Sequence, residues 1–173
     1  QTLAHILTEK NAQRLTQPAL IVLPTSLIAN WQDEAARFTP QLQLLCLHGS
    51  QRHNLFSQIA SADIVITTYA LLSRDSQHLL AQDWSMVILD EAQNIKNPRS
   101  KAALCASQLR AQQRLCLTGT PVENNLGELW SLFNFLMPGW LGDQQNFTRH
   151  YRTPIEKHAD DGCDERFNNP LYY

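Results

Sequence analysis

The sequence predicts an α/β protein with an open, mainly parallel sheet that is flanked by helices on both faces. Short apolar runs alternate with helix-like segments along most of the 173 residues, a pattern typical of parallel strands joined by crossover helices. The runs are continuously apolar, as expected for strands that are buried on both faces. The length fits one domain, and a hydrophobic share of 43% is sufficient for a packed core.

Five apolar runs are the predicted strands. The first ends at Pro24, the second closes at His48 and Gly49, and the fourth leads directly into Asp90 and Glu91. The runs cover residues 19–23, 42–47, 63–69, 86–89 and 114–117.

The segments between these runs have the spacing of helices. The chain opens with apolar residues in helical spacing, although no capping residue precedes them. Ser26 is a candidate N-cap for a helix with an apolar face that ends at Phe38, and Pro98 suits the first turn of a later helix. After the opening segment, helices are expected at residues 27–38, 54–60, 70–81, 98–109 and 126–136.

The last of these helices has both a start signal and an apolar stripe. Asn125 and Glu128 have the spacing of a capping box. From Asn146 onward the chain becomes polar and charged and offers no strong helix or strand. We therefore predict one domain at residues 1–145 and a polar C-terminal extension at residues 146–173. The predicted stripe consists of Leu126, Leu129, Trp130, Phe133 and Leu136.

Composition and charge exclude several classes of protein. Fourteen basic and 16 acidic residues give a net charge of -2, which excludes a uniformly cationic nucleic-acid-binding surface but permits a local phosphate-binding face. The four cysteines form no Cys-x-x-Cys pair, so neither a zinc site nor a disulfide framework is expected. No apolar run approaches a membrane span, and residues 1–10 lack a secretory pattern. We expect no membrane partner and a cytoplasmic protein, nucleoid-associated in a bacterium or nuclear in a eukaryote.

The pair Asp90 and Glu91 is the main candidate for chemistry. A buried parallel strand that ends in two carboxylates matches the Walker B pattern, in which the first carboxylate holds magnesium against phosphate oxygens. The second can orient or polarise the attacking water. A buried strand that ends in two solvated acidic residues without a catalytic role would have the same sequence pattern. However, Ala92 and Gln93 complete a DEAQ box, and the next apolar run leads into Thr-Gly-Thr-Pro at residues 118–121.

In this order, the motifs resemble those of the first RecA-like lobe of Swi/Snf-type DNA-dependent ATPases, within helicase superfamily two. The resemblance runs from residue 1 to about residue 155. It implies a three-layer P-loop NTPase (RecA-like) lobe with an open, mainly parallel sheet flanked by helices, and it implies ATP and magnesium as ligands. The matching segments are Leu-Pro-Thr-Ser-Leu at 23–27, His-Gly at 48–49, Thr-Thr-Tyr at 67–69, Leu-Asp-Glu-Ala-Gln at 89–93 and Leu-Thr-Gly-Thr-Pro at 117–121.

The resemblance implies roles for the matching residues. Asp90 is similar to the magnesium-holding carboxylate, Glu91 to the water-activating carboxylate and Gln93 to the position that senses the nucleotide state. Hydroxyl groups on a strand-end loop can change hydrogen-bond partners when the terminal phosphate leaves. The motif that couples hydrolysis to lobe movement is matched by Thr118, Gly119 and Thr120.

The resemblance also implies a track for the backbone of double-stranded DNA. Hydroxyls and free amides at helix N-termini bind phosphates without reading base sequence, although ordinary N-caps would explain Ser26 and Thr68 equally well. The two motifs that line the track match Pro24, Thr25 and Ser26, and Thr67, Thr68 and Tyr69. The residues expected to pack in the core or at an interface instead of stacking on bases are Trp31, Trp84 and Trp130.

The phosphate-binding loop of the family has no match in the chain. No Gly-x-x-x-x-Gly-Lys-Ser/Thr segment occurs, and residues 1–3 resemble the run that follows this loop. We therefore expect the chain to begin just after the loop and to end before the second RecA-like lobe, an expected partner that supplies arginine fingers. The chain alone should be deficient in ATP hydrolysis, since an arginine finger is worth roughly 10³–10⁵ in rate in related NTPases.

Two functions are compatible with this pattern. The first is a fragment of an ATP-dependent double-stranded-DNA translocase or chromatin-remodeller-like helicase, which contributes the DEAQ and Thr-Gly-Thr-Pro motifs. The alternative is a non-catalytic, degenerate lobe that docks on DNA or on a protein, and the missing loop favours it. An unrelated doubly wound domain would explain the fold but not the order of the motifs.

Overall fold

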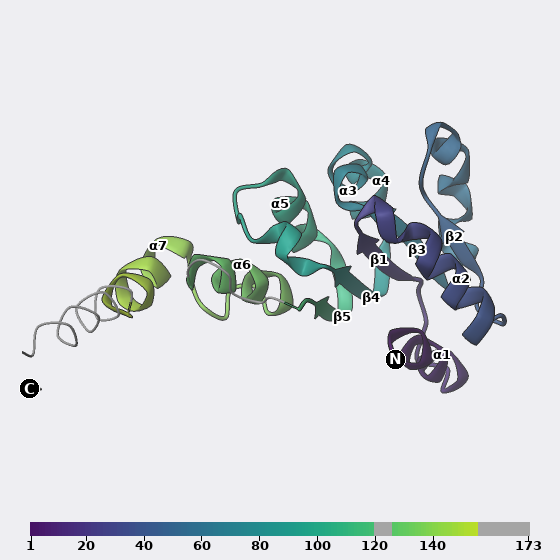
Figure 1. The fold of residues 1–173 in the computed structure, drawn as a ribbon, viewed down its shortest axis with the longest axis horizontal. Helices are drawn as coiled ribbons and strands as arrows, with labels where there is room; N and C mark the ends of the chain where they lie inside the picture. The colour runs from purple at the N-terminus through teal and green to yellow at the C-terminus, as the bar shows by residue number, and fades with distance from the viewer. Residues whose placement is uncertain (120–125, 156–173) are drawn as a thin grey trace, which may run out of the picture.

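The protein is built on a five-stranded parallel sheet, seen in a computed structural model that describes residues 1–119 and 126–155 (Figure 1). The strand order is β2-β3-β1-β4-β5, and all neighbouring strands run parallel. The carboxyl ends of the strands therefore lie at one edge of the sheet. The strands are β1 (Ala19–Leu23), β2 (Leu44–Cys46), β3 (Ile64–Thr68), β4 (Asp83–Asp90) and β5 (Arg110–Leu117).

Helical segments connect the strands and continue beyond β5 (Figure 1). None of the helices described is long and apolar enough to cross a membrane. The α-helices are α1 (Thr2–Asn11), α2 (Ile28–Phe38), α3 (Tyr69–Arg74), α4 (Ser76–Leu80), α5 (Lys101–Gln108), α6 (Leu126–Leu136) and α7 (Gln144–Phe147). The 3₁₀ segments are η1 (Thr25–Leu27), η2 (Ser50–Ser61) and η3 (Ala92–Ile95), and η4 (Thr148–Arg152) is a π-helical turn.

Alternate residues of the strands face two separate hydrophobic cores. On β1, Ala19, Ile21 and Leu23 belong to the core that includes residues of α1 and α2. Leu20 and Val22 belong to the core that includes residues of α3 to α6. Because β3 and β4 alternate in the same way, the sheet is the middle layer of three. The predicted α/β class and the five predicted strands are confirmed.

Two predicted helix starts are wrong. Ser26 lies inside η1 and makes no capping hydrogen bond, and α2 begins after Leu27. α5 begins after Ser100 instead of at Pro98, because the Ser100 hydroxyl accepts a hydrogen bond from the Ala103 N–H at 3.1 Å. A short hydroxyl side chain at the actual cap position decides where α5 starts.

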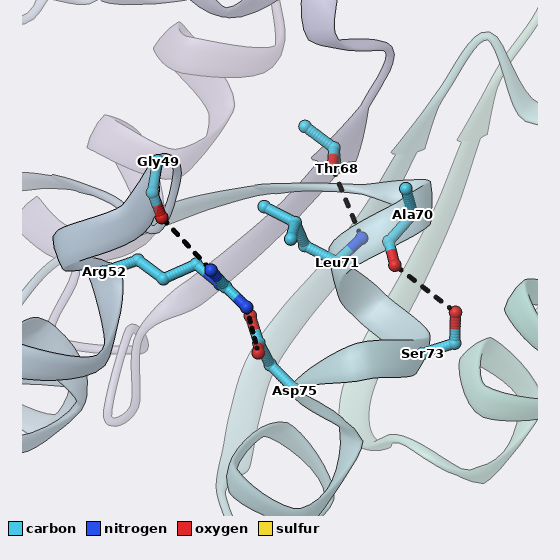
Figure 2. A network of polar contacts seen from close by, with 7 residues as sticks. All are labelled: Gly49, Arg52, Thr68, Ala70, Leu71, Ser73 and Asp75. Carbon is cyan, nitrogen blue, oxygen red and sulfur yellow. Dashed lines mark hydrogen bonds and ion pairs between the residues drawn. The ribbon is translucent and has the colours of Figure 1, made fainter.

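The helix predicted at residues 70–81 is divided into α3 and α4 at Asp75. Arg52 of η2 donates from Nε to Asp75 Oδ2 at 2.7 Å and from Nη2 to Oδ1 at 3.0 Å, as Figure 2 shows. Arg52 Nη1 also donates to the backbone oxygen of Gly49 at 3.1 Å. The hydrogen bonds to Asp75 raise the pKa of the Arg52 guanidinium above its usual value. This ion pair ties η2 to the junction of the two helices.

Removing the charge of Asp75 should lower the melting temperature of the chain. Only 3% of the Asp75 side chain is exposed, so in Asp75→Asn the Arg52 guanidinium faces a neutral amide that cannot accept both of its hydrogen bonds. We expect the melting temperature, measured by circular dichroism, to fall by about 5 °C. Asp83→Asn is the control, because the Arg110–Asp83 pair has the same 2.7 Å separation but is exposed. Equal shifts in the two variants would contradict this role for Asp75.

The apolar stripe predicted on α6 has the wrong phase. Trp130 is buried as predicted, but Leu132 and Phe135 are the other apolar side chains buried in the core, and Phe133 is only partly buried. The buried face also contains the polar residues Glu128 and Ser131, so apolar periodicity does not identify it. Asn125, the predicted cap, lies outside the described residues.

Residues 144–155 are helical, contrary to the prediction of no strong helix after Asn146. The Asp143 carboxylate accepts a hydrogen bond from the Asn146 N–H at 2.8 Å and so caps α7. Phe147 is buried, and its ring stacks on that of Tyr151 with centroids 5.6 Å apart. The cap and the aromatic pair are therefore among the local contacts of this short segment. The rest of the predicted extension, residues 156–173, lies outside the described residues.

Candidate active site

The ends of four strands bring the motif residues to the carboxyl edge of the sheet. The strand register pairs Leu23 with Thr68, and Asp90 with Leu117. The loops after β1, β3, β4 and β5 therefore leave the sheet from neighbouring positions. This edge is where ligands bind in open α/β sheets.

The Asp90 carboxylate is held in place by two hydrogen bonds. Trp31 of α2 donates from Nε1 to Asp90 Oδ2 at 2.8 Å, and the Glu91 N–H donates to Oδ1 at 3.0 Å. The Tyr69 hydroxyl donates to the Asp90 backbone oxygen at 2.7 Å. Two helices that follow other strands thus set the orientation of this residue.

A row of hydrogen bonds joins the end of β4 to the end of β5. Gln93 donates from Nε2 to Glu91 Oε2 at 2.6 Å, and the Thr118 hydroxyl donates to Gln93 Oε1 at 2.9 Å. Since an ionised carboxylate only accepts hydrogen bonds, the Gln93 amide nitrogen must face Glu91. Its oxygen is then left for Thr118, so the side chain connects the two strand ends in one orientation.

The backbone of Glu91 is left-handed, with φ 51° and ψ 54°. Non-glycine residues seldom adopt this conformation, and it is common at functional sites. The Asn94 side chain donates to the Glu91 backbone oxygen at 2.8 Å and supports the turn. Of the other predicted coupling residues, Gly119 is exposed next to Thr118, and Thr120 lies outside the described residues.

Tyr69 is buried close to the two carboxylates. Burial, with smaller electrostatic effects of the neighbouring Cys116, Asp90 and Glu91, raises the pKa of its hydroxyl well above the ordinary value. Tyr69 therefore stays protonated and keeps donating to Asp90. Burial also raises the pKa of the Cys116 thiol to about 12.

Arg114 anchors the strand that leads to Thr118. Its guanidinium donates to the backbone oxygens of Ala106, Leu109 and Phe135 and lies 5.2 Å from the centre of the Phe135 ring. Burial lowers the pKa of this guanidinium. A single side chain of β5 thus holds both α5 and α6 against the strand.

The predicted DNA-contacting residues after β1 are accessible. The side chains of Thr25 and Ser26 are exposed, and Pro24 is half-buried. Their position at the carboxyl edge gives two hydroxyl groups that can reach a ligand from solvent.

The predicted DNA-contacting residues at the end of β3 and the start of α3 are buried. Thr67 and Thr68 are only 1% and 3% exposed, and the Tyr69 hydroxyl faces Asp90. The Thr68 hydroxyl accepts a hydrogen bond from the Leu71 N–H at 3.4 Å and caps α3 (Figure 2). The N-cap alternative for Thr68 therefore has a geometric basis.

A family model described as SNF2-related domain matches residues 1–168. The chain belongs to the SNF2-related family. The structure agrees with this membership, because the SWI2/SNF2 ATPase core of Sulfolobus solfataricus, solved in complex with dsDNA, superposes with a TM-score of 0.83 at 39% sequence identity. The chain thus has the RecA-like fold of that ATPase core. The superposition covers 90% of this chain and 32% of that one.

SNF2-family relatives include much longer proteins. A putative ATP-dependent helicase/translocase of Bacillus subtilis, YwqA, is 38% identical over 164 residues, which is 93% of this chain and 18% of that protein. The TATA-binding protein-associated factor MOT1 of Saccharomyces cerevisiae is 40% identical over 140 residues, which is 80% of this chain and 8% of MOT1. The chain therefore spans less than a fifth of these relatives.

Asp90 of this SNF2-related chain has the donor atoms that magnesium prefers. Magnesium takes oxygen ligands and is usually held by one or two carboxylates together with phosphate and water oxygens. Each Asp90 oxygen accepts one hydrogen bond and so retains further acceptor capacity, and the residue is only half-buried. Within residues 1–119 and 126–155, no group of three or more His, Cys, Asp or Glu side chains is arranged to hold a metal ion. Asp90 therefore suits a magnesium ion whose other ligands are phosphate and water oxygens.

Sequence reasoning missed the contact of Trp31 with Asp90. Trp31 was expected to pack, and its ring does belong to the core beside α1 and α2, but its N–H also reaches the carboxylate. The signal was the place of Trp31 in the helix that directly follows the Leu-Pro-Thr-Ser-Leu segment. Arg114 was missed as well, because nothing in the sequence marks which carbonyl groups a buried guanidinium will reach.

Replacing Thr67 by valine should stabilise this SNF2-related domain. The Thr67 hydroxyl is buried and has no hydrogen-bond partner among the described residues. Thr67→Val replaces it by a methyl group of similar size, so the free energy of unfolding in urea should rise by about 1 kcal/mol. Thr68→Val is the control and should lower it by about 1 kcal/mol, since it removes the cap of α3. A loss of DNA affinity in Thr67→Val would instead support the predicted DNA contact of this hydroxyl.

Proposed function

We propose that this chain is part of an ATP-driven double-stranded-DNA translocase of the chromatin-remodeller type. The observation that carries the proposal is the row of hydrogen bonds from Glu91 through Gln93 to Thr118, beside the fixed carboxylate of Asp90. Such a row allows a change at one strand end to reach the loop after the next strand. The dsDNA in the archaeal neighbour and the helicase/translocase name of the bacterial relative support the choice of DNA.

In this proposal each residue of the row has one task. Asp90 holds magnesium, which, when bound, neutralises charge on the phosphate oxygens. Glu91 orients the attacking water through its carboxylate, and Gln93 reports the state of Glu91 to Thr118. The loop of Thr118, Gly119 and Thr120 then passes the change to the second RecA-like lobe, and the DNA backbone contacts the hydroxyls of Thr25 and Ser26.

The experiment uses a chimera in which the matching part of the archaeal ATPase core is replaced by this chain; we call it the core chimera. We expect the core chimera to hydrolyse ATP faster when double-stranded DNA is added. We expect no measurable turnover from the 173-residue chain alone, since the chain has no Gly-x-x-x-x-Gly-Lys-Ser/Thr loop to position the phosphates. DNA-stimulated ATP turnover by the chain alone, abolished by Glu91→Gln, would contradict the expectation that the chain alone does not hydrolyse ATP.

A non-catalytic docking lobe is the second candidate, and the missing loop is the observation that favours it. The core chimera separates the two functions. A folded chimera that binds DNA but shows no DNA-stimulated ATP hydrolysis supports the docking lobe. Stimulated hydrolysis supports the translocase.

Replacing Trp31 by phenylalanine should weaken the response of the core chimera to magnesium. Phenylalanine keeps an aromatic ring in the core but removes the N–H that holds Asp90 Oδ2. Mutation of a residue that orients a metal ligand typically lowers metal affinity or activity by about 10–100-fold. We expect the magnesium concentration for half-maximal rate to rise by about 10-fold, with the KM for ATP at saturating magnesium unchanged.

Trp130→Phe is the matched control for this measurement. The Trp130 N–H donates to the backbone oxygen of Gly142 at 3.3 Å and has no carboxylate partner in the described part of the chain. Its loss should leave the magnesium dependence unchanged. The same rise in both variants would show that Trp31 acts only through general packing.

A further inference from the structure

A hollow lined by arginines lies outside the candidate active site. It has a volume of about 550 Å³ and lies between Arg99, in the loop before α5, and the helical segment of α7 and η4. Figure 1 shows α7 beyond α6, at the opposite end of the molecule from α2. Within residues 1–119 and 126–155, no acidic side chain is in its lining, which includes Arg99, Arg149, Arg152, Thr148, Thr153 and Gln145.

Positive charge is concentrated at this end of a chain whose net charge is -2. An adjacent hollow of about 280 Å³ is also lined by Arg152, and it adds Lys96 together with one acid, Glu128. Asp143, next to the lining in sequence, already accepts hydrogen bonds from Asn146 with both oxygens, at 2.8 and 2.7 Å. Among the residues that the structure describes, the basic groups around the two hollows therefore outnumber the acidic ones.

The guanidinium groups of Arg99 and Arg149 are available to a ligand. Both side chains are exposed, and neither has an acceptor among residues 1–119 and 126–155. Like charges around one concave surface repel one another, and an anion between them relieves the repulsion. Guanidinium groups bind phosphate oxygens through two parallel N–H bonds, so phosphate suits this lining better than a single carboxylate does.

We propose that this hollow binds phosphate groups and that their source is the backbone of a nucleic acid. The choice of nucleic acid rests on the proposed function, whereas the phosphate chemistry rests on the lining alone. Arginines that contact phosphates add affinity without reading base sequence. The hollow therefore gives the lobe a second anchoring point for a polyanion, separate from Thr25 and Ser26.

The test measures binding of the 173-residue chain to a fluorescein-labelled 20-bp duplex by anisotropy at several salt concentrations. The variant Arg99→Gln/Arg149→Gln removes two charges from the hollow. We expect affinity to fall about 10-fold at low salt and the slope of log K against log salt to become about 2 units shallower. The control Arg37→Gln/Arg110→Gln removes two charges from arginines that do not line the hollow and should keep the slope.

A second arm uses inorganic pyrophosphate and follows the arginine Nε–H resonances by NMR. Resonances of Arg99 and Arg149 should shift in the unchanged chain. If pyrophosphate shifts them while the duplex binds both double variants equally, the hollow takes a small phosphorylated ligand and only the nucleic-acid source is overturned. No shift together with an unchanged salt slope overturns the proposal, as does equally tight binding of poly-glutamate at the same arginines.

The variant Thr25→Ala/Ser26→Ala separates this inference from the proposed function. Loss of duplex binding in that variant, without any effect of the hollow variant, leaves the translocase proposal standing and rejects the hollow. If the unchanged chain binds pyrophosphate in the hollow but does not bind the duplex, the proposed DNA contact is overturned and the phosphate site is supported.

Discussion

Glu91→Gln should lower the DNA-stimulated kcat of the core chimera by about 10²–10⁴-fold, the usual effect of removing a group that activates a water molecule. The amide oxygen of glutamine still accepts the hydrogen bond from Gln93, so the row to Thr118 keeps its geometry and only the negative charge is lost. The KM for ATP should therefore change little, because Asp90 and its two hydrogen bonds are untouched. Steady-state hydrolysis at saturating DNA measures both constants.

Asp33→Asn is the control for Glu91→Gln. It removes one negative charge from an exposed position on α2 and should leave kcat unchanged. A fall of less than 10-fold in Glu91→Gln, with the Asp90 hydrogen bonds intact, would show that another group activates the water.

Trp84→Ala should cost about 3–5 kcal/mol of unfolding free energy, a large part of the usual stability of a domain of this size. Trp84 is one of the largest fully buried side chains, and its indole N–H donates to the Leu79 backbone oxygen at 3.1 Å. The variant therefore loses packing between α4 and β4 and leaves a buried carbonyl without its donor. Urea denaturation, followed by circular dichroism, gives the free energy.

Trp140→Ala is the comparison on the same scale. Trp140 is 67% exposed and stacks on Phe133 with centroids 5.9 Å apart, so its loss should cost less than about 1 kcal/mol. If Trp84→Ala does not fold, Trp84→Phe keeps most of the ring volume and should still cost about 1–2 kcal/mol through the lost hydrogen bond. A Trp84→Phe variant as stable as the unchanged chain would contradict the account.

The strands could be predicted because their signal is local. Each run that is buried on both faces is continuously apolar, and parallel pairing then brings Asp90 and Thr118 to the same edge without any further information. The sequence predicted that Glu91, Gln93 and Thr118 lie close together. It did not predict that hydrogen bonds connect them in a row. The donor and acceptor pairs depend on side-chain rotamers that the pattern does not encode.

The elements that were predicted wrongly are governed by contacts between distant residues. The break at Asp75 depends on Arg52, which is 23 residues away in the chain, and the helical spacing around Asp75 gives no sign of it. The buried face of α6 depends on what covers it, because that face contains the polar residues Glu128 and Ser131 as well as apolar ones. Trp31 was predicted to be a packing residue. Its hydrogen bond to Asp90 could not be predicted without the position of Asp90 in space.

The left-handed backbone of Glu91 makes this residue a poor choice for stability and a good one for chemistry. A non-glycine residue in this conformation costs about 1–3 kcal/mol, and glycine would adopt it with little strain. Selection for thermal tolerance alone would therefore favour Glu91→Gly, which lacks the carboxylate. A screen of this chain for heat resistance is expected to enrich variants that have lost the proposed catalytic group, so directed evolution of this domain has to select for turnover as well as for stability.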